Sequence, residues 1–231
     1  AAGPVRVFVG RSTGPRPWLA RGFFHDLSDL DLDSLARGAL PASCILEDEP
    51  VFLVCTHAKR NACCGRLGLP VARALAAALT ASGHPDRVWE TTHVGGDRYA
   101  ANLVCLPHGL YYGSMSQAAA IAAANAYRHG EIVLDRFRGR AGIPEPLQAA
   151  EHFVRVHTGE RSVGGVAVES FRSDGDVTEA VVRRGDIRYQ VVVEPTVFLP
   201  PCPAAGEDVC AGDSFTTYRL VALRALQYTL T

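Results

Sequence analysis

The chain has 231 residues, of which 48% are hydrophobic and 20% are charged, so it can bury one large core or two small ones. Its formal net charge of −1 lacks the basic surplus that binding to nucleic acid or to an anionic membrane usually requires. No apolar run approaches the roughly 18 residues that span a bilayer, and the N-terminus has no signal-peptide pattern. We therefore expect a soluble, cytoplasmic protein. The chain begins with Ala rather than Met, which leaves room for residues upstream.

The chain contains seven cysteines, and an odd number excludes a complete disulfide framework within one chain. Without a secretory signal, free thiols or metal ligands are expected instead. Cys44 and Cys105 lie beside or inside apolar runs and are predicted to be packing residues. The loop around Cys64 is locally basic, and this charge would stabilise thiolates or attract an acidic redox partner.

The first 50 residues predict a strand and an acidic lead-in. Val5–Gly10 alternates enough to form a first strand, which the Gly- and Pro-containing residues 12–17 end. Residues 23–38 carry leucines among aspartates, a pattern that suggests a short amphipathic helix ending at Gly38.

A strand-helix-strand unit is predicted next. Val51–Val54 is an unbroken apolar run, typical of a central strand covered on both faces. Apolar residues recur at helical spacing in Leu69–Leu79, where Pro70 suits the first turn. Arg87–Val94 is predicted to be the second strand. Because such a unit favours a parallel crossover, the ends of both strands should meet at one edge of the sheet.

A hairpin and two helices are predicted to complete this unit. Leu103–Leu106 and Leu110–Tyr112 flank a Pro-His-Gly turn, which indicates a hairpin. The helices are expected at Gln117–His129, capped by Ser114 or Ser116, and at Gln148–Val156. Strand, helix, strand, hairpin, helix is the thioredoxin-like order.

The remainder of the chain predicts an antiparallel β meander. Its short valine-rich strands are Val166–Arg172, Val177–Arg183, Ile187–Glu194 and, after a long loop at Pro195–Ser214, Thr216–Leu223. We therefore expect an α/β protein with three parts: a lead-in (1–50), a thioredoxin-like domain (51–160), and an antiparallel β-rich C-terminal segment (161–231) that packs on or extends this domain.

Cys55 and Cys64 are the first candidate metal ligands. They are nine positions apart, too far for a CxxC redox motif, and they lie at the two ends of one loop, from which both can approach a metal centre. Burial as small apolar side chains is the alternative for both. Neighbouring residues point apart, so only one of Cys63 and Cys64 should face the site.

His93 is the third candidate. It follows the second strand, which the crossover should bring beside the cysteine loop. Gly95 and Gly96 let the backbone approach a cluster or an anion closely. A histidine at the end of a strand can also be purely structural, and its expected nearness to the cysteines favours the ligand interpretation.

The segments CTHAKRNACCG and VWETTHVGGDRYAANLVCLPHGLYYG resemble the sucrase/ferredoxin-like family, also described as thioredoxin-like 2Fe-2S ferredoxins. The resemblance covers about Val51–Val156, the C-terminal meander is compatible with it, and the first 40 residues match poorly. It implies a thioredoxin-like domain that binds a 2Fe-2S cluster through cysteine and histidine. Such a protein would carry single electrons between a reductase and an acceptor protein. The resemblance favours an electron carrier over an enzyme, and the family name implies no sugar chemistry.

By position, the resemblance implies Cys55, Cys64 and His93 as cluster ligands. Relatives with two histidines have the second one four residues later, where this chain has Asp97, so the fourth ligand is open. A carboxylate is an uncommon partner for an iron-sulfur centre. The candidates are Cys210, which we favour, Cys202 and Asp97.

The resemblance also implies neighbours of the cluster. Gly95, Gly96 and Arg98 would lie against it, and Arg98 or Lys59 would donate hydrogen bonds to its sulfurs. Asn61 replaces an acidic residue that is common in the loop motif, a change that removes no ligand.

Two other functions stay open on the residues alone. A thiol oxidoreductase or peroxidase would use Cys55 or Cys64 with a depressed pKa. A zinc-stabilised binding module would use the two cysteines with His93 and Asp97, a set that satisfies tetrahedral zinc.

Overall fold

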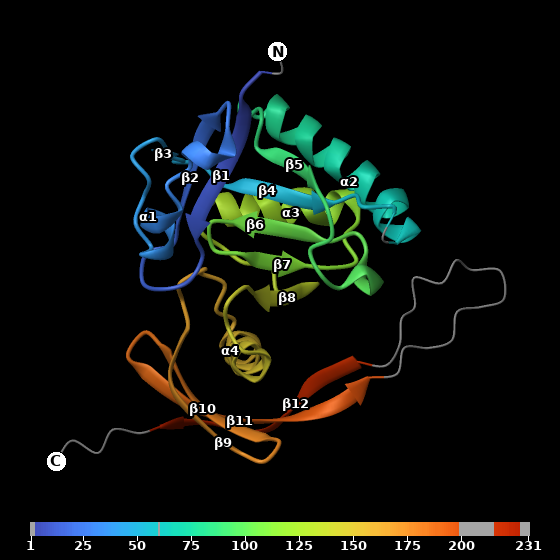
Figure 1. Cartoon of the computed structure of the whole chain (residues 1–231). Helices are drawn as coiled ribbons and strands as arrows, with labels where there is room; N and C mark the ends of the chain where they lie inside the picture. The colour runs from blue at the N-terminus through green and yellow to red at the C-terminus, as the bar shows by residue number, and fades with distance from the viewer. Residues whose placement is uncertain (1–2, 60, 199–214, 227–231) are drawn as a thin grey trace.

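The computed structural model describes residues 3–59, 61–198 and 215–226. The strands are β1 (Val5–Arg11), β2 (Trp18–Phe24), β3 (Ile45–Leu46), β4 (Val51–Cys55), β5 (Val88–Thr91), β6 (Leu103–Leu106), β7 (Leu110–Tyr112), β8 (Phe137–Arg140), β9 (Ala167–Asp174), β10 (Val177–Arg184), β11 (Ile187–Phe198) and β12 (Phe215–Leu226). The helices are α1 (Leu32–Ala36), α2 (Ala62–Ala81), α3 (Gln117–Arg128) and α4 (Glu145–Thr158), with 3-10 turns η1 (Leu27–Asp29) and η2 (Asp97–Tyr99). Within the described residues, these elements form three sheets with a β-rich C-terminal region (Figure 1).

The central sheet has the strand order β5-β4-β6-β7-β8. β4 pairs in parallel with β5, as the predicted crossover through α2 requires, and Cys55 lies opposite Thr91. The other pairings in this sheet are antiparallel, including the predicted β6-β7 hairpin. The chain order strand, helix, strand, hairpin, helix is therefore confirmed for β4, α2, β5, β6-β7 and α3.

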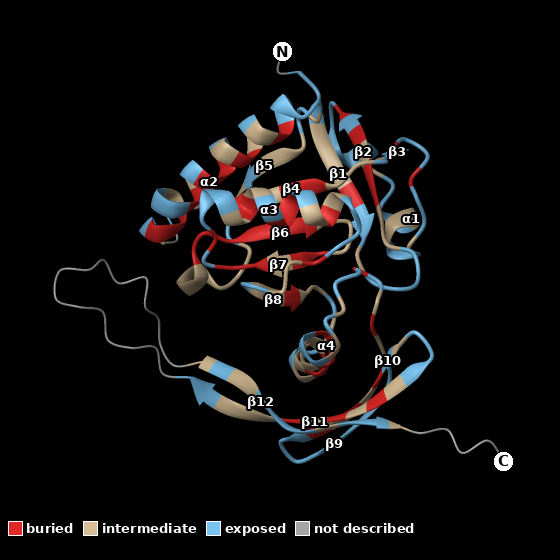
Figure 2. Cartoon of the chain, turned by 180° about the vertical axis from the view of Figure 1, so that it is seen from behind, coloured by how far each residue is buried: buried red, intermediate tan, exposed pale blue. Residues whose placement is uncertain are grey.

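Helices α2 and α3 cover one face of the central sheet. The largest core cluster joins buried side chains of both helices to β4, β6 and β7, with Leu75 of α2 and Leu103 of β6 fully buried. Figure 2 shows this burial as red segments along these strands, with α3 lying across the sheet. The predicted N-cap of α3 is Ser116, whose Oγ accepts the Ala119 N–H at 3.2 Å.

Helix α2 begins earlier than the sequence suggested. Its N-cap is Asn61, whose side-chain oxygen accepts the Cys63 N–H at 2.9 Å, so the helix includes both adjacent cysteines. The prediction that Pro70 opens the helix is wrong, since Pro70 lies inside it. By length and composition, α2 is also apolar enough to cross a membrane, and it is the one such helix in the described ranges. The sequence had predicted no apolar stretch of this length. Core helices meet the same criterion, and α2 packs on the sheet.

The first 50 residues form more structure than predicted. β1 is confirmed, but β2 and β3 were missed, and together they make a separate antiparallel sheet in the order β1-β2-β3. The expected acidic helix is reduced to η1 and the five-residue α1. Cys44 is buried in the small core of this sheet, which confirms its packing role.

The C-terminal meander is confirmed as an antiparallel sheet in the order β12-β11-β10-β9. Helix α4 packs on one face of it, and Val154 of α4 and Val191 of β11 are fully buried in a second core. β11 continues through Pro195, which was expected to begin a loop. The strand tolerates this proline because β10 pairs with β11 only as far as Val193, so Pro195 pairs on one side alone, with Tyr218 of β12.

Candidate functional site

The thiols of Cys55 and Cys64 meet at the end of β4. Cys55 is the last residue of the strand and Cys64 lies in the first turn of α2; each is 1% exposed. The two side chains are hydrogen bonded, and both are free thiols, whereas Cys63 is disulfide-bonded. Ala100 and Val94 complete the apolar wall around them. We call Cys55 and Cys64 with this wall the cysteine centre.

Two glycines allow α2 to lie this close to β4. A Cβ atom at Gly68 would lie 2.0 Å from the carbonyl oxygen of Cys55, and one at Gly65 would lie 2.6 Å from the Cβ atom of Ala58. Side chains at these positions would push the helix away from the strand end. The glycines therefore fix the distance across which the two thiols meet.

Asp97 is tied to the same helix end. The Asn61 side chain, which caps α2 with its oxygen, donates from Nδ2 to Oδ2 of Asp97 at 3.2 Å. The loop after β5 is thereby held beside the first turn of α2. The negative charge of Asp97 also acts on Cys64.

Burial raises the pKa of the Cys64 thiol, and its hydrogen bond to Cys55 and the charges of Cys55 and Asp97 raise it further. Without a bound cation, Cys64 is therefore a neutral thiol at pH 7. A nucleophilic cysteine needs the opposite shift, because the thiolate is the reactive form. Cys105, at 0% exposed, likewise has its pKa raised by burial, as expected for a packing residue.

His93 lies at the predicted edge of the sheet, two residues beyond Thr91, which pairs with Cys55. Its side chain is exposed. Within the described ranges, no group of three or more His, Cys, Asp or Glu side chains is arranged to hold a metal ion. The structure thus brings the thiols of Cys55 and Cys64 together and ties the Asp97 loop to the same helix end, and it does not assemble His93 with the two thiols. Cys202 and Cys210 lie outside the described residues.

The two glycines after His93 adopt left-handed backbone angles, with φ of 86° at Gly95 and 68° at Gly96. A Cβ atom at Gly96 would lie 2.4 Å from Nη2 of Arg138, while one at Gly95 would meet nothing within 4 Å. The close approach at Gly96 is therefore made by an arginine of β8. The Arg98 guanidinium lies 4.8 Å from the ring of Phe215, and Lys59 is exposed.

Asn102 connects these parts, and the sequence did not single it out. Its side chain is buried, donates to the Gly96 carbonyl at 2.9 Å and accepts from Nη1 of Arg138 at 2.9 Å. Its own carbonyl accepts the Cys55 N–H at 3.2 Å. One buried residue thus links the end of β4, through its backbone, to the glycine loop and β8, through its side chain. An isolated asparagine gives no sequence signal for such a role.

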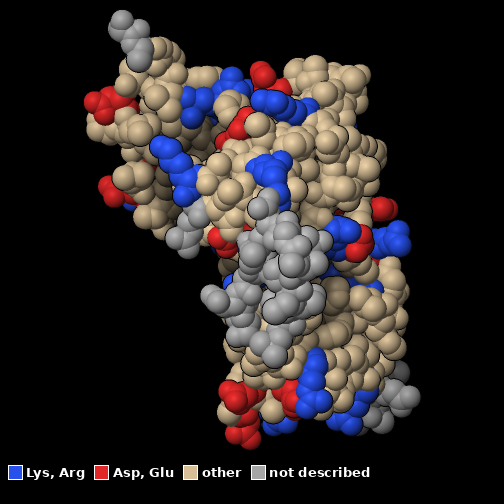
Figure 3. All heavy atoms as spheres, turned by 90° about the vertical axis from the view of Figure 1, so that its right-hand side faces the viewer, with Lys and Arg blue, Asp and Glu red and all other residues tan. Residues whose placement is uncertain are grey.

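On the face shown in Figure 3, basic and acidic side chains are interspersed among uncharged ones. The expected basic character of the cysteine loop rests on Lys59 and Arg66, both exposed; Arg60 lies outside the described residues.

Comparison with known proteins gives one match. The profile of the sucrase/ferredoxin-like family covers residues 18–139, just over half of the chain. No curated protein and no solved structure matches. The matched segment begins well before Val51, so the N-terminal strands that the resemblance left aside are partly inside it, and it ends before α4. The chain belongs to the sucrase/ferredoxin-like family.

Proposed function

We propose that this protein binds a 2Fe-2S cluster and carries single electrons between redox partner proteins. The observation that carries the proposal is the pair of free thiols, Cys55 and Cys64, touching each other at the end of a buried strand. Membership of the sucrase/ferredoxin-like family supports it. Two adjacent thiols in an apolar wall, with no depressed pKa at Cys64, suit metal ligation better than nucleophilic chemistry.

The proposed ligands are Cys55, Cys64, His93 and Cys210. Cys64 is preferred over Cys63 because it is the free thiol in contact with Cys55. His93 belongs to the loop that Asp97 ties to the first turn of α2. For the fourth position, Cys202 and Asp97 are the alternatives. The charge of Asp97 acts on Cys64, but thiolate is the better donor to iron.

The residues present fit such a cluster in part. The described ranges supply a preformed thiol pair, and His93 lies at the same edge of the sheet in an exposed position. When bound, the group would supply one-electron chemistry. Binding would release the proton that Cys64 holds as a thiol, so loading should become easier as pH rises. A histidine ligand makes the potential less negative; roughly −150 to +300 mV is found for centres with two histidines.

We infer a thioredoxin-like fold for the central region. The order β4, α2, β5, β6-β7, α3 and the single parallel pair in an otherwise antiparallel sheet support it. In this proposal the carrier is cytoplasmic, Gly95, Gly96 and Arg98 flank the cluster, and Lys59 and Arg66 meet acidic surfaces of a reductase and an acceptor.

A zinc-stabilised binding module is the second candidate. The contact between Cys55 and Cys64 and the hydrogen bond that ties Asp97 to Asn61 at the start of the same helix favour it, since zinc accepts thiolate and carboxylate ligands together. A thiol oxidoreductase based on Cys64 is disfavoured, because burial raises rather than lowers the pKa of this thiol.

The test is anaerobic purification followed by an absorption spectrum and assays of iron, zinc and acid-labile sulfide. We expect two irons and two sulfides per chain and visible charge-transfer bands. Changing His93→Ala should deplete the cluster or shift its bands and potential, whereas His129→Ala, at an exposed position on α3's C-terminal end, should not. If the anaerobically purified protein is colourless and holds one zinc per chain, the electron-carrier proposal is wrong and the zinc-stabilised binding module is supported.

A further inference from the structure

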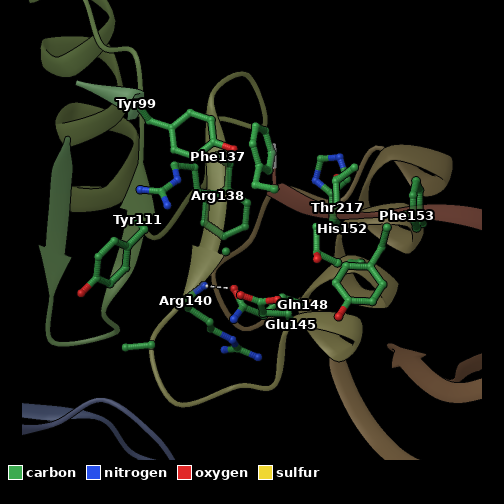
Figure 4. Close-up of a pocket in the computed structure, with 16 residues that line it drawn as sticks. Tyr99, Tyr111, Phe137, Arg138, Arg140, Glu145, Gln148, His152, Phe153 and Thr217 are labelled. Carbon is green, nitrogen blue, oxygen red and sulfur yellow. Dashed lines mark hydrogen bonds between the residues drawn. The ribbon is translucent and has the colours of Figure 1, made fainter. Parts of the chain in front are cut away.

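A cavity of about 540 Å³ lies between β8, α4 and β12 (Figure 4). This volume is in the range of small-molecule sites. We call it the arginine pocket and define it by Arg138 and Arg140 of β8, Gln148 and His152 of α4, and Phe215 and Tyr218 of β12. The walls of the pocket come both from the part of the chain that matches the family profile (residues 18–139) and from the C-terminal sheet. The proposed electron transfer does not use this pocket.

The lining is strongly aromatic. Six of its 16 residues are Phe or Tyr, against 8% of Phe, Tyr and Trp in the whole chain. Tyr99 and Phe215 approach edge to face, with ring centroids 5.4 Å apart. Aromatic walls around an open cavity offer stacking and edge contacts to a planar ring.

Arg138 gives the β8 wall a positive charge. In the pairing with β7, Tyr111 lies opposite Gly139 and Tyr112 opposite Phe137, so Arg138 is the extra residue of a β-bulge, a feature that redirects side chains at binding sites. Its guanidinium lies 4.4 Å from the Tyr99 ring and donates to Asn102. Among the residues that the structure describes, no carboxylate forms an ion pair with Arg138. Burial lowers its pKa, as expected for a partly buried cation without a carboxylate partner.

Arg140 adds an unused donor to the same wall. Its Nη2 donates to Glu151 at 2.5 Å, but its buried Nε–H has no hydrogen-bond partner within the described part of the chain. Buried guanidinium donors are normally paired, but this one has almost no surface open to the cavity, so the recognition of an anion is left to Arg138. Gly139, between the two arginines, lets α4 close against the strand, where the Gln148 side chain accepts the Arg140 N–H at 3.0 Å.

The negative charge of the lining lies elsewhere. Glu145, in the first turn of α4, is the one carboxylate among the described residues that line the pocket. Burial raises the pKa of Tyr218, and the charge of Glu145 raises it further. Figure 4 shows Arg138 on β8 and Glu145 and His152 on α4, across the cavity from it. The pocket is therefore cationic at β8 and acidic at the start of α4.

We propose that the arginine pocket binds a planar aromatic carboxylate, with its ring between the aromatic walls and its carboxylate at Arg138. The aromatic lining selects the ring, and the Arg138 guanidinium, which has no carboxylate partner among the described residues, selects the anion. This proposal is independent of the iron-sulfur cluster, and it can be tested on the full chain with or without metal.

The test uses 1-naphthoate as the probe and isothermal titration calorimetry as the measurement. We expect saturable binding of one naphthoate per chain. The neutral 1-naphthylmethanol, which lacks the anion, and cyclohexanecarboxylate, which lacks the aromatic ring, should each bind about tenfold more weakly or worse, since the first loses the charge-assisted hydrogen bond and the second loses the stacked ring.

Variants assign the binding to this pocket. Arg138→Gln should weaken naphthoate about tenfold while its amide can still donate to Asn102, and Phe153→Ala should weaken it by a similar factor from the opposite wall. The matched control is Arg172→Gln, an arginine of β9 whose side chain is 78% exposed, which should bind like the wild type. Circular dichroism checks that each variant is folded. Absence of saturable naphthoate binding, equal binding of the neutral analogue, or wild-type affinity in both pocket variants would overturn the proposal.

Discussion

The cysteine centre and the arginine pocket are opposite in character although one buried residue connects them. The cysteine centre is closed and apolar, and the Cys64 thiol becomes charged only if a cation neutralises it. The arginine pocket is open, aromatic and cationic along β8. Asn102 bonds to the backbone at both Cys55 and Gly96 and to the side chain of Arg138. A single buried residue therefore lies between a site suited to a cation and one suited to an anion.

The largest effect is expected at the cysteine centre itself. Cys64→Ser should reduce iron and sulfide in anaerobically purified protein to background, because a hydroxyl is a poor replacement for a thiolate ligand. Cys105→Ala removes an equally buried thiol from the main core and should leave the iron content per folded chain unchanged. Equal iron loss in the two variants would mean that general destabilisation, rather than ligation, is being measured.

Asn102→Ala should disturb the glycine loop and Arg138 together, while its backbone bond to Cys55 is kept. It leaves the Gly96 carbonyl and a guanidinium N–H of Arg138 without partners in a buried region, which costs about 3 kcal/mol of unfolding free energy. Urea denaturation measures the loss. Asn125→Ala, at an exposed position on α3, should cost less than about 1 kcal/mol. If the two asparagine variants are equally stable, Asn102 does not connect the sites.

Gly68→Ala should affect the cysteine centre alone. The new methyl group would meet the Cys55 carbonyl oxygen at 2.0 Å, so we expect a net loss of about 2 kcal/mol, with part of the clash offset by better helix propensity. Naphthoate binding should be retained. Gly164→Ala is the control, since nothing lies within 4 Å of its added carbon. If Gly68→Ala leaves the free energy of unfolding unchanged, α2 does not need this close approach to β4.

The smallest effect concerns acid stability of the C-terminal region. Hydrogen bonds from the backbone and side chain of Ser162, and then Arg184, lower the pKa of Glu160 from 4.5 to about 2. Since the folded-state pKa is the lower one, the ionised Glu160 stabilises the fold fully above pH 4.5, and this contribution is lost as pH falls from 4.5 towards 2.

Denaturation of wild type and Glu160→Gln at several pH values measures this contribution. The gap between their unfolding free energies should be constant above about pH 5 and should shrink as pH falls. Arg184→Gln should have the smaller influence on this profile, because Ser162 is the larger cause of the shift. Parallel profiles for wild type and Glu160→Gln would contradict the assignment.

Local patterns predicted the elements that form the cysteine centre, and long-range partners explain what they missed. The apolar run ending at Cys55, the crossover to His93 and the hairpin around the Pro-His-Gly turn follow from periodicity and turn chemistry. The start of α2 was missed because Pro70 is a common first residue of helices, whereas the Asn61 cap determines the true start.

The arginine pocket had no comparable signal. Arg138 and Asn102 are 36 positions apart, and α4 and β12 each supply only a few lining residues, so no single stretch of sequence contains the site. β2 and β3 were missed for a similar reason, because their pairing stabilises a pattern that is weak in each strand alone.

The most direct test of the central claim is pulsed electron paramagnetic resonance of the reduced, anaerobically purified protein labelled with ¹⁵N-histidine. We expect the signal of a reduced 2Fe-2S centre with one strongly coupled histidine nitrogen, and loss of that coupling in His93→Ala. No iron-sulfur signal in intact anaerobic protein, or a signal without nitrogen coupling, would contradict cluster binding by Cys55, Cys64 and His93.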